Sequence, residues 1–244
     1  MGLRRVVLWD IDHTLIDTRG VGRKLSGIAF EQVTGLRMEQ QARIDGITEP
    51  VIFRETAKLH GLQTGRRDFE RFAQALAEAH MQHAAELRER GHALPGAAAA
   101  LDAMAAVPDF AQTVVTGNVR PVAETKLGAF GLHRHIRWEL GAYGEDADER
   151  TELVSIALRR SGIGPANAVL VDDTPAGVAA GIANRVKVIA VATGRSSATE
   201  LAQAGAHFVL ADLSNTAAVV SVLSASHPEG PPPVTQTSVP GPQG

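Results

Sequence analysis

Short apolar runs recur along the chain, separated by stretches with helical periodicity. The runs occupy Val6 up to Asp10, 113–115, 168–171, 186–191 and 208–210. Continuous apolar runs of this kind are typical of strands that are buried on both faces. Because these strands alternate with helices along the chain, the pattern predicts an α/β fold with a doubly wound parallel sheet.

The segment from residue 20 to 91 departs from this alternation, because it contains apolar stripes of helical periodicity and no run with strand character. The first stripe ends near Gly35. The second begins after Thr48, which suits a helix N-cap, and stops at Gly61, and the third ends at Gly91. The residues expected to be buried in the second and third stripes are Ile52, Phe53, Thr56, Leu59, Phe69, Phe72, Leu76, His83 and Leu87.

A helical block within an α/β chain predicts an inserted, all-helical domain. We assign residues 1–16 and 93–226 to the α/β core and residues 17–92 to the inserted domain, with 94–96 as the hinge where the chain returns. Residues 227–244 are rich in proline and small polar residues, and this composition predicts a disordered tail.

Composition excludes several functions. The 244-residue chain has a formal net charge of −3, which argues against nucleic acid as a partner, and its N-terminal apolar run is too short to span a membrane. The chain contains no cysteine, which excludes thiolate catalysis and cysteine-bound zinc and fits a reducing compartment. We therefore expect a cytoplasmic protein that needs no membrane, and the sequence implies no particular oligomeric state.

Two aspartates, Asp10 and Asp12, follow the first apolar run. Open α/β sheets bind ligands at the carboxyl ends of their strands, so both residues lie where chemistry is expected. Residues two apart on an extended chain point the same way, and adjacent carboxylates repel unless they share a proton or a divalent cation. The Asp-x-Asp-x-Thr pattern, completed by Thr14, therefore predicts a metal-dependent site with an acidic nucleophile.

A second acidic pair, Asp172 and Asp173, ends the run 168–171. If this strand neighbours the first, four carboxylates converge, and without a basic partner they need a cation. Oxygen ligands favour Mg²⁺ over zinc. The alternative is that Asp173, Thr174 and Pro175 only begin a helix, with a capping residue and proline in the first turn.

Polar residues also follow the run 113–115, where Thr116, Gly117 and Asn118 precede a helical stretch. A hydroxyl, an amide and free backbone N–H groups at the start of a helix can bind phosphate oxygens. The alternative is an ordinary helix N-cap, since most turns from strand to helix favour such residues.

Taken together, the motifs at 10–15, 116–118 and 172–173 resemble those of the haloacid dehalogenase superfamily of phosphohydrolases. The helical insertion is similar to the C1-type cap of that superfamily. The segments 44–48, 94–96 and 188–195 are similar to those of phosphoglycolate phosphatase-like members. The resemblance implies a Rossmann-like core, Mg²⁺ as the cofactor and a small phosphorylated metabolite as the substrate.

The resemblance also implies a role for each matching residue. Asp10 would be the nucleophile that forms an aspartyl-phosphate, and Asp12 would be the general acid and later the general base. Thr116 and Asn118 would hold the phosphoryl oxygens, and Thr14 would support the loop. The Mg²⁺ ligands would be the Asp10 carboxylate, the Asp12 backbone carbonyl and Asp173, with Asp172 acting directly or through water.

The chain departs from the family pattern at two places. His13 stands where the family usually has glycine, and its imidazole either contacts the substrate or points away. The family's third motif is usually a lysine that offsets the charge of the nucleophile, but 146–152 contains no lysine. Arg150 occupies the expected position, and Lys126 is the other candidate unless it lies on a solvated helix face.

Three functions follow from this pattern. The first is a Mg²⁺-dependent phosphatase for small phosphomonoesters. The second is a sugar phosphomutase of the β-phosphoglucomutase kind, which shares the nucleophile and the metal. The third is a non-catalytic binding protein, favoured only by the missing lysine. A dehalogenase is disfavoured, since it has no use for the acid at Asp12.

Two loops of the inserted domain, around 20–23 and 43–49, are expected to select the substrate. We expect Arg23 or Arg43 to meet a carboxylate on the substrate, and the sequence does not discriminate between them. His80 and His83 lie about one helical turn apart and could form a metal pair, but a partly solvated helix face is the simpler interpretation.

Overall fold

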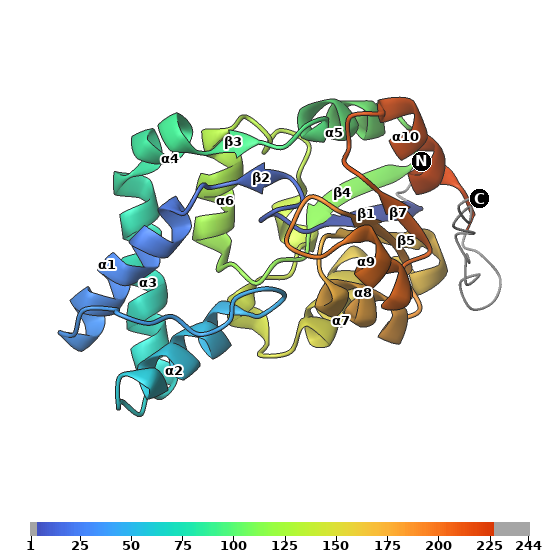
Figure 1. Cartoon of the computed structure of the whole chain (residues 1–244). Coiled ribbons are helices and arrows are strands. Elements are labelled where there is room, and N and C mark those ends of the chain that lie inside the picture. Colours follow the sequence, from blue (N-terminus) through green and yellow to red (C-terminus); the bar gives the residue numbers. More distant parts are fainter. Residues whose placement is uncertain (1–3, 227–244) are drawn as a thin grey trace, which may run out of the picture.

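The computed structural model describes residues 4–226, and within them a five-stranded sheet has the order β4-β1-β5-β6-β7 (Figure 1). Every neighbouring pair of these strands is parallel, so the predicted doubly wound parallel sheet is confirmed. The strands are β1 (Arg5–Trp9), β4 (Phe110–Val114), β5 (Ala168–Asp172), β6 (Lys187–Val191) and β7 (Phe208–Leu210).

The central strand β1 is buried on both faces, because its residues alternate between two apolar clusters. Val7 and Trp9 pack toward α5 and α10, whereas Val6 and Leu8 pack toward α7 and α8. These helices form two layers, one on each face of the sheet (Figure 1). They are α5 (Ala97–Ala105), α7 (Arg150–Ser161), α8 (Pro175–Ala183) and α10 (Thr216–Ser224).

Two further helices and three short 3₁₀ turns complete the core. Helix α6 (Arg120–Ala129) follows β4, and α9 (Ala198–Gln203) packs on β6 and β7. The 3₁₀ turns are Trp138–Leu140, Gly144–Asp146 and Pro165–Asn167.

Four helices between β1 and β4 form a separate group, which we call the helical insert. They are α1 (Val21–Thr34), α2 (Glu49–Leu59), α3 (Arg66–Gln82) and α4 (Ala84–Arg90). Phe30, Phe53 and Phe72 build its core, with the rings of Phe53 and Phe72 stacked 4.5 Å apart. Val122 of α6 joins the same cluster, so the insert packs against the α/β core through α6.

The predicted helix ends are largely confirmed. Helix α1 ends at Gly35, whose φ of 74° is accessible to glycine at little cost, and α2 begins after Thr48. The expected burial of Leu59 was wrong, because this residue lies in the last turn of α2 and its exposed fraction is 52%. The third stripe is two helices, because α3 ends before His83 and the chain turns there.

The chain enters and leaves the helical insert through two short strands that pair antiparallel, β2 (Ile16–Asp17) and β3 (His92–Ala93). The described residues between 20 and 91 contain no strand, as predicted. The division into 1–16 with 93–226 and 17–92 stays a prediction, and the β2–β3 pair lies where those parts would join. The predicted disordered tail, 227–244, lies outside the described residues.

Candidate active site

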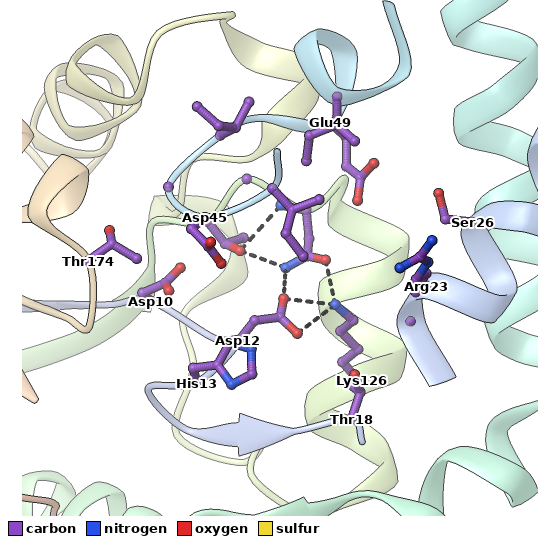
Figure 2. A pocket seen from close by; sticks show the side chains of 18 of the residues that line it. Asp10, Asp12, His13, Thr18, Arg23, Ser26, Asp45, Glu49, Lys126 and Thr174 are labelled. Carbon is purple, nitrogen blue, oxygen red and sulfur yellow. Dashed lines mark hydrogen bonds and ion pairs between the residues drawn. The ribbon is translucent and has the colours of Figure 1, made fainter. Parts of the chain in front are cut away.

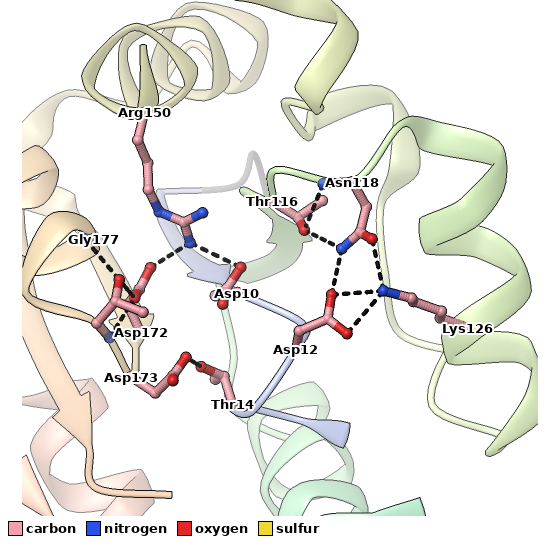
Figure 3. A network of polar contacts seen from close by, with 11 residues as sticks. Asp10, Asp12, Thr14, Thr116, Asn118, Lys126, Arg150, Asp172, Asp173 and Gly177 are labelled. Atoms are coloured by element: carbon pink, nitrogen blue, oxygen red, sulfur yellow. Dashed lines mark hydrogen bonds and ion pairs between the residues drawn. The ribbon is translucent and has the colours of Figure 1, made fainter. Parts of the chain in front are cut away.

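The polar residues singled out in the sequence gather at one edge of the sheet, where β1, β4 and β5 end side by side. Asp10 directly follows β1, and its backbone N–H donates to the carbonyl of Val171 at 2.9 Å. Thr116 comes two residues after β4, and Asp172 ends β5. Adjacent parallel strands therefore bring together side chains that lie more than 100 residues apart in the sequence (Figure 3).

Arg150, the first residue of α7, lies between two of these carboxylates. Its Nη2 is 2.8 Å from Asp10 Oδ1 and 2.5 Å from Asp172 Oδ2, and all three side chains are buried. Burial opposes the charge of Arg150, but Asp10 and Asp172 outweigh that effect and raise the pKa of the guanidinium. Arg150 is therefore a permanent cation beside Asp10.

Asp10, Asp172 and Asp173 each offer a carboxylate oxygen within 4.8 Å of the others. Burial, reinforced by repulsion from Asp172, raises the pKa of Asp10 to about 7, although Arg150 counteracts it. Burial and the charges of Asp172 and Asp10 raise the pKa of Asp173 to about 9. Fully ionised, the cluster would carry more negative charge than Arg150 balances, and its all-oxygen donor set fits Mg²⁺.

The three carboxylates are not equally available as ligands. The backbone N–H and the hydroxyl of Thr174 donate to Asp172 Oδ1 at 2.9 and 2.7 Å, and Arg150 takes Oδ2. Asp173 accepts only one hydrogen bond from the described residues, from Thr14 Oγ1 at 3.2 Å. Asp173 can therefore face a cation directly, whereas Asp172 is already engaged through both oxygens.

Asp12 belongs to a second network (Figure 3). Lys126 Nζ donates to both of its carboxylate oxygens at 2.8 Å, and Asn118 Nδ2 donates to Oδ2 at 2.7 Å. Asn118 also contacts Lys126 and the hydroxyl of Thr116, at 2.7 and 2.8 Å. Burial acts to raise the pKa of Asp12, but the charge of Lys126 and the hydrogen bonds from Asn118 and Lys126 outweigh it and lower the pKa.

The expectation that the carboxylates of Asp10 and Asp12 point the same way was wrong. Asp10 turns toward Arg150 and Asp12 toward Lys126, and the Asp12 carboxylate lies outside the acidic cluster. Strand β1 ends at Trp9, and the chain folds back just after Asp12, where His13 adopts a left-handed φ of 60°. Three of the four carboxylates converge and Asp12 lies apart from them, with Arg150 beside Asp10 and Lys126 beside Asp12 as basic partners.

The left-handed conformation also explains the family preference for glycine at this position, since a side chain there costs about 1–2 kcal/mol. His13 is one of the residue types that tolerate this region best. The hydroxyl of Thr193 donates to the backbone carbonyl of His13 at 2.5 Å, which stabilises the turn. The side chain lines the cavity described below, so it does not point away from the site.

The structure rules out a solvated position for Lys126 and a simple helix cap at Thr116–Asn118. Lys126 is 6% exposed, so the interpretation as a solvated helix face was wrong. Helix α6 begins at Arg120 with Val119 at its N-cap, so the interpretation of Thr116–Asn118 as a simple cap was wrong as well. Thr174 does cap α8, because its hydroxyl accepts from the N–H of Gly177 at 3.0 Å. The cap does not account for Asp172 and Asp173, which belong to the acidic cluster.

A cavity between the sheet edge and the helical insert holds these groups (Figure 2). The space in it that a water-sized sphere can occupy is about 150 Å³, which holds several waters and therefore suits a small metabolite. Arg23 lines this cavity, whereas Arg43 lines a neighbouring hollow. The site residues that line it are Asp10, Asp12, His13, Thr116, Gly117, Asn118, Lys126, Arg150 and Asp173.

Two further residues line the cavity, Glu49 and His80. The sequence placed Glu49 at the end of a loop expected to select the substrate, without a role of its own, and considered His80 only as part of a metal pair. His80 is 2% exposed, so its placement on a solvated helix face was wrong, and no described metal-binding group includes it. A signal was present, because His80 continues the buried spacing of Phe69, Phe72 and Leu76 along α3. Glu49 resembled an ordinary acidic residue in the first turn of a helix.

The loop before α2 closes the cavity against the core. The backbone N–H of Glu49 donates to the carbonyl of Gly117 at 2.9 Å, and Thr48 Oγ1 donates to the carbonyl of Asp148 at 2.8 Å. A Cβ at Gly117 would overlap the carbonyl oxygen of Ile47. Only glycine therefore lets this loop approach the strand end so closely.

Gly117→Ala is expected to lower kcat/KM for a phosphate ester by about 10- to 100-fold, because it displaces the loop and misplaces the substrate by a fraction of an ångström to an ångström. Steady-state phosphate release measures the effect. Gly128→Ala is the matched control, since an added Cβ there meets nothing within 4 Å. Wild-type kcat/KM in Gly117→Ala would show that this close approach is unimportant.

None of the helices within residues 4–226 combines the length and apolar character needed to cross a membrane. The sheet-edge aspartates, the buried cations and the helical insert together define an α/β enzyme class whose chemistry takes place at strand ends. The haloacid dehalogenase-like hydrolase family model matches residues 7–191. The chain belongs to this family.

Solved structures with low sequence identity share the fold. A hydrolase from Pseudomonas syringae has a TM-score of 0.68 at 17% identity, covering 91% of this chain and 100% of that one. A predicted phosphoglycolate phosphatase from Haemophilus somnus has a TM-score of 0.62 at 16% identity, with coverages of 90% and 99%. A β-phosphoglucomutase from Clostridium difficile has a TM-score of 0.64 at 13% identity, with coverages of 86% and 92%. Among curated protein sequences, none matches this chain significantly.

Proposed function

We propose that the protein is a Mg²⁺-dependent phosphatase that hydrolyses small phosphomonoesters through an aspartyl-phosphate on Asp10. The observation that carries this proposal is the buried pair of Asp10 and Arg150 in a cavity that also holds Asp12. A carboxylate can attack an anionic phosphate only if nearby cations offset the charges of both. Arg150 offers that offset at the nucleophile, and Lys126 acts on Asp12 instead.

The reaction has two steps. A carboxylate oxygen of Asp10 attacks phosphorus, the bond to the ester oxygen breaks, and Asp12 gives the leaving oxygen a proton. Asp12 then takes a proton from water as that water attacks the aspartyl-phosphate, which releases inorganic phosphate and restores Asp10.

The electrostatics of Asp12 suit this exchange of roles. Its lowered pKa keeps it ionised in the free enzyme, which is the form needed to accept a proton from water. The negative charge of a bound phosphate raises the pKa of a neighbouring carboxyl, which favours the protonated form needed for the first step. Thr116, Gly117 and Asn118 line the cavity and would bind phosphoryl oxygens, and His13 lines the same space.

The acidic cluster would hold the metal. Asp10, Asp173 and the backbone carbonyl of Asp12 are the direct ligands that we propose. Asp172 would act through water, because both of its oxygens are engaged by Arg150 and Thr174. Bound Mg²⁺ would neutralise part of the phosphoryl charge and polarise a phosphoryl oxygen.

The two alternative functions have less support. The non-catalytic interpretation rested on the missing lysine, and Arg150 supplies a cation at that place. A phosphomutase would use the same residues, and no observation in the cavity favours it over a phosphatase. The absence of cysteine fits a reducing compartment, and we propose the cytoplasm as the location.

Phosphate release from a panel of phosphorylated metabolites, with and without Mg²⁺, tests the proposal. We expect release that depends on Mg²⁺ for at least one class of ester. Interconversion of glucose 1-phosphate and glucose 6-phosphate with little phosphate released would identify a mutase. No release from any ester, including p-nitrophenyl phosphate, would refute the phosphatase.

A further inference from the structure

The part of the cavity away from Asp10 contains two polar atoms that have no hydrogen-bond partner among residues 4–226. Glu49 begins α2 and His80 lies near the end of α3, and both line the cavity. Figure 2 shows Glu49 on the side of the cavity where Arg23 and Ser26 lie, away from Asp10. A substrate phosphate held at Asp10 would therefore extend its leaving group toward Glu49 and His80.

Both side chains have a buried polar atom that is not hydrogen-bonded within the described part of the chain. Glu49 Oε2 and His80 Nε2 are inaccessible to solvent and have no hydrogen-bond partner among the described residues. Buried polar atoms in folded proteins nearly always have such partners, so an unpaired couple in one cavity indicates a ligand.

The hydrogen bonding of His80 fixes what it offers to that ligand. His80 Nδ1 lies 2.9 Å from the carbonyl oxygen of Leu76, so Nδ1 carries the proton and Nε2 presents a lone pair. Burial and the charge of Lys126 lower the pKa of His80 to about 4, so the ring is neutral near pH 7. His80 Nε2 is therefore a hydrogen-bond acceptor.

Glu49 offers an acceptor and, when protonated, a donor. Burial raises the pKa of Glu49 to about 7, although the charge of Lys126 counteracts it. A carboxyl group in this state pairs well with a hydroxyl, since a hydroxyl can both donate and accept.

Charge and hydrogen bonding disfavour other leaving groups. Lys126 is close enough to act on both Glu49 and His80, and Arg23 lines the same cavity, so an ammonium group would be repelled. A carboxylate could pair with Arg23, but it would leave His80 Nε2 and Glu49 without a hydrogen-bond donor. An alkyl group would leave both polar atoms unpaired.

We infer that Glu49 and His80 bind hydroxyl groups on the leaving group, so that the substrate is a phosphate monoester of a polyol or sugar. This inference rests on the proposed phosphatase function and names its substrate class.

Matched pairs of esters test the inference. We expect kcat/KM for glycerol 1-phosphate to exceed that for n-propyl phosphate, and ribitol 5-phosphate to exceed n-pentyl phosphate, by about 10- to 100-fold. The same ratio of kcat/KM is measured for O-phosphoethanolamine, whose leaving group carries an amine, and for phosphoglycolate, whose leaving group carries a carboxylate, each against ethyl phosphate. The inference is overturned if the ratio of kcat/KM to ethyl phosphate is larger for O-phosphoethanolamine or phosphoglycolate than the ratio within the hydroxylated pairs. It is also overturned if the two esters of each hydroxylated pair have equal kcat/KM.

Variants assign the preference to the two residues. Glu49→Leu and His80→Leu should each lower the ratio of kcat/KM within a hydroxylated pair by about 10-fold, and Glu49→Gln should retain more of it because its amide oxygen accepts. Glu55→Leu is the control on α2, since Glu55 pairs with Lys58 outside the cavity. His83→Leu is the control for His80, because His83 bonds a carbonyl in the same way but does not line the cavity.

The controls should keep the wild-type ratio. A loss that is as large in Glu55→Leu and His83→Leu as in the cavity variants would overturn the assignment. If a leucine variant fails to fold, the wild-type comparison of ester pairs still decides the inference. Release from p-nitrophenyl phosphate without a hydroxyl preference refutes only the inference, whereas no release from any ester refutes the phosphatase itself.

Discussion

Replacing Arg150 with methionine is expected to lower the free energy of unfolding by about 3–5 kcal/mol, because it leaves buried carboxylates without their cation. The guanidinium contacts both Asp10 and Asp172, and both carboxylates are buried. Methionine preserves much of the apolar stem, so the loss reports the charge rather than a cavity. Chemical unfolding of both proteins in metal-free buffer measures it.

Arg160→Met is the matched control on the same helix, since Arg160 pairs with Asp146 and its side chain is 37% exposed. Exposed pairs contribute about 0–1 kcal/mol, so the control should lose much less stability. Adding Mg²⁺ should restore more stability to Arg150→Met than to Arg160→Met, because a bound cation replaces the missing charge. Equal losses in the two variants would contradict the electrostatic role that we assign to Arg150.

Asp10→Asn should abolish phosphate release, with a loss of about 10⁴-fold or more, because an amide cannot form the acyl-phosphate. Asparagine has nearly the shape of aspartate and keeps an oxygen for Arg150, so the fold should persist. Thermal unfolding and circular dichroism check this. Asp12→Asn should lose about 10²- to 10⁴-fold, because the nucleophile remains while proton transfer is lost.

The location of the site could be predicted because it depends on local pattern. Apolar runs end at Asp10, Thr116 and Asp172, and the carboxyl ends of neighbouring parallel strands share one edge. The order of the strands was assumed rather than predicted, but any arrangement with β1 beside β4 and β5 produces this convergence. Helix ends at Gly35 and Gly61 were also predictable from glycine alone.

Side-chain directions could not be predicted, because they depend on single backbone angles and on packing between distant segments. Asp10 turns toward Arg150 and Asp12 toward Lys126, and nothing in a one-sequence pattern reveals which distant cation each carboxylate meets. Lys126 looked like a surface lysine until β1 and α6 were brought together. Hydrophobic periodicity also cannot separate a helix face that packs in a core from one that lines a cavity, so it did not show that His80 is buried at the cavity.

The central claim is that Asp10 carries the phosphoryl group during turnover. Acid quench of Asp12→Asn during reaction with a ³²P-labelled ester, followed by peptide mapping, tests it most directly, because slowed hydrolysis lets the intermediate accumulate. We predict label on the peptide that contains Asp10 and none after the same treatment of the Asp10→Asn, Asp12→Asn double variant. Label on another residue, or turnover by Asp10→Asn at the wild-type rate, would contradict the account.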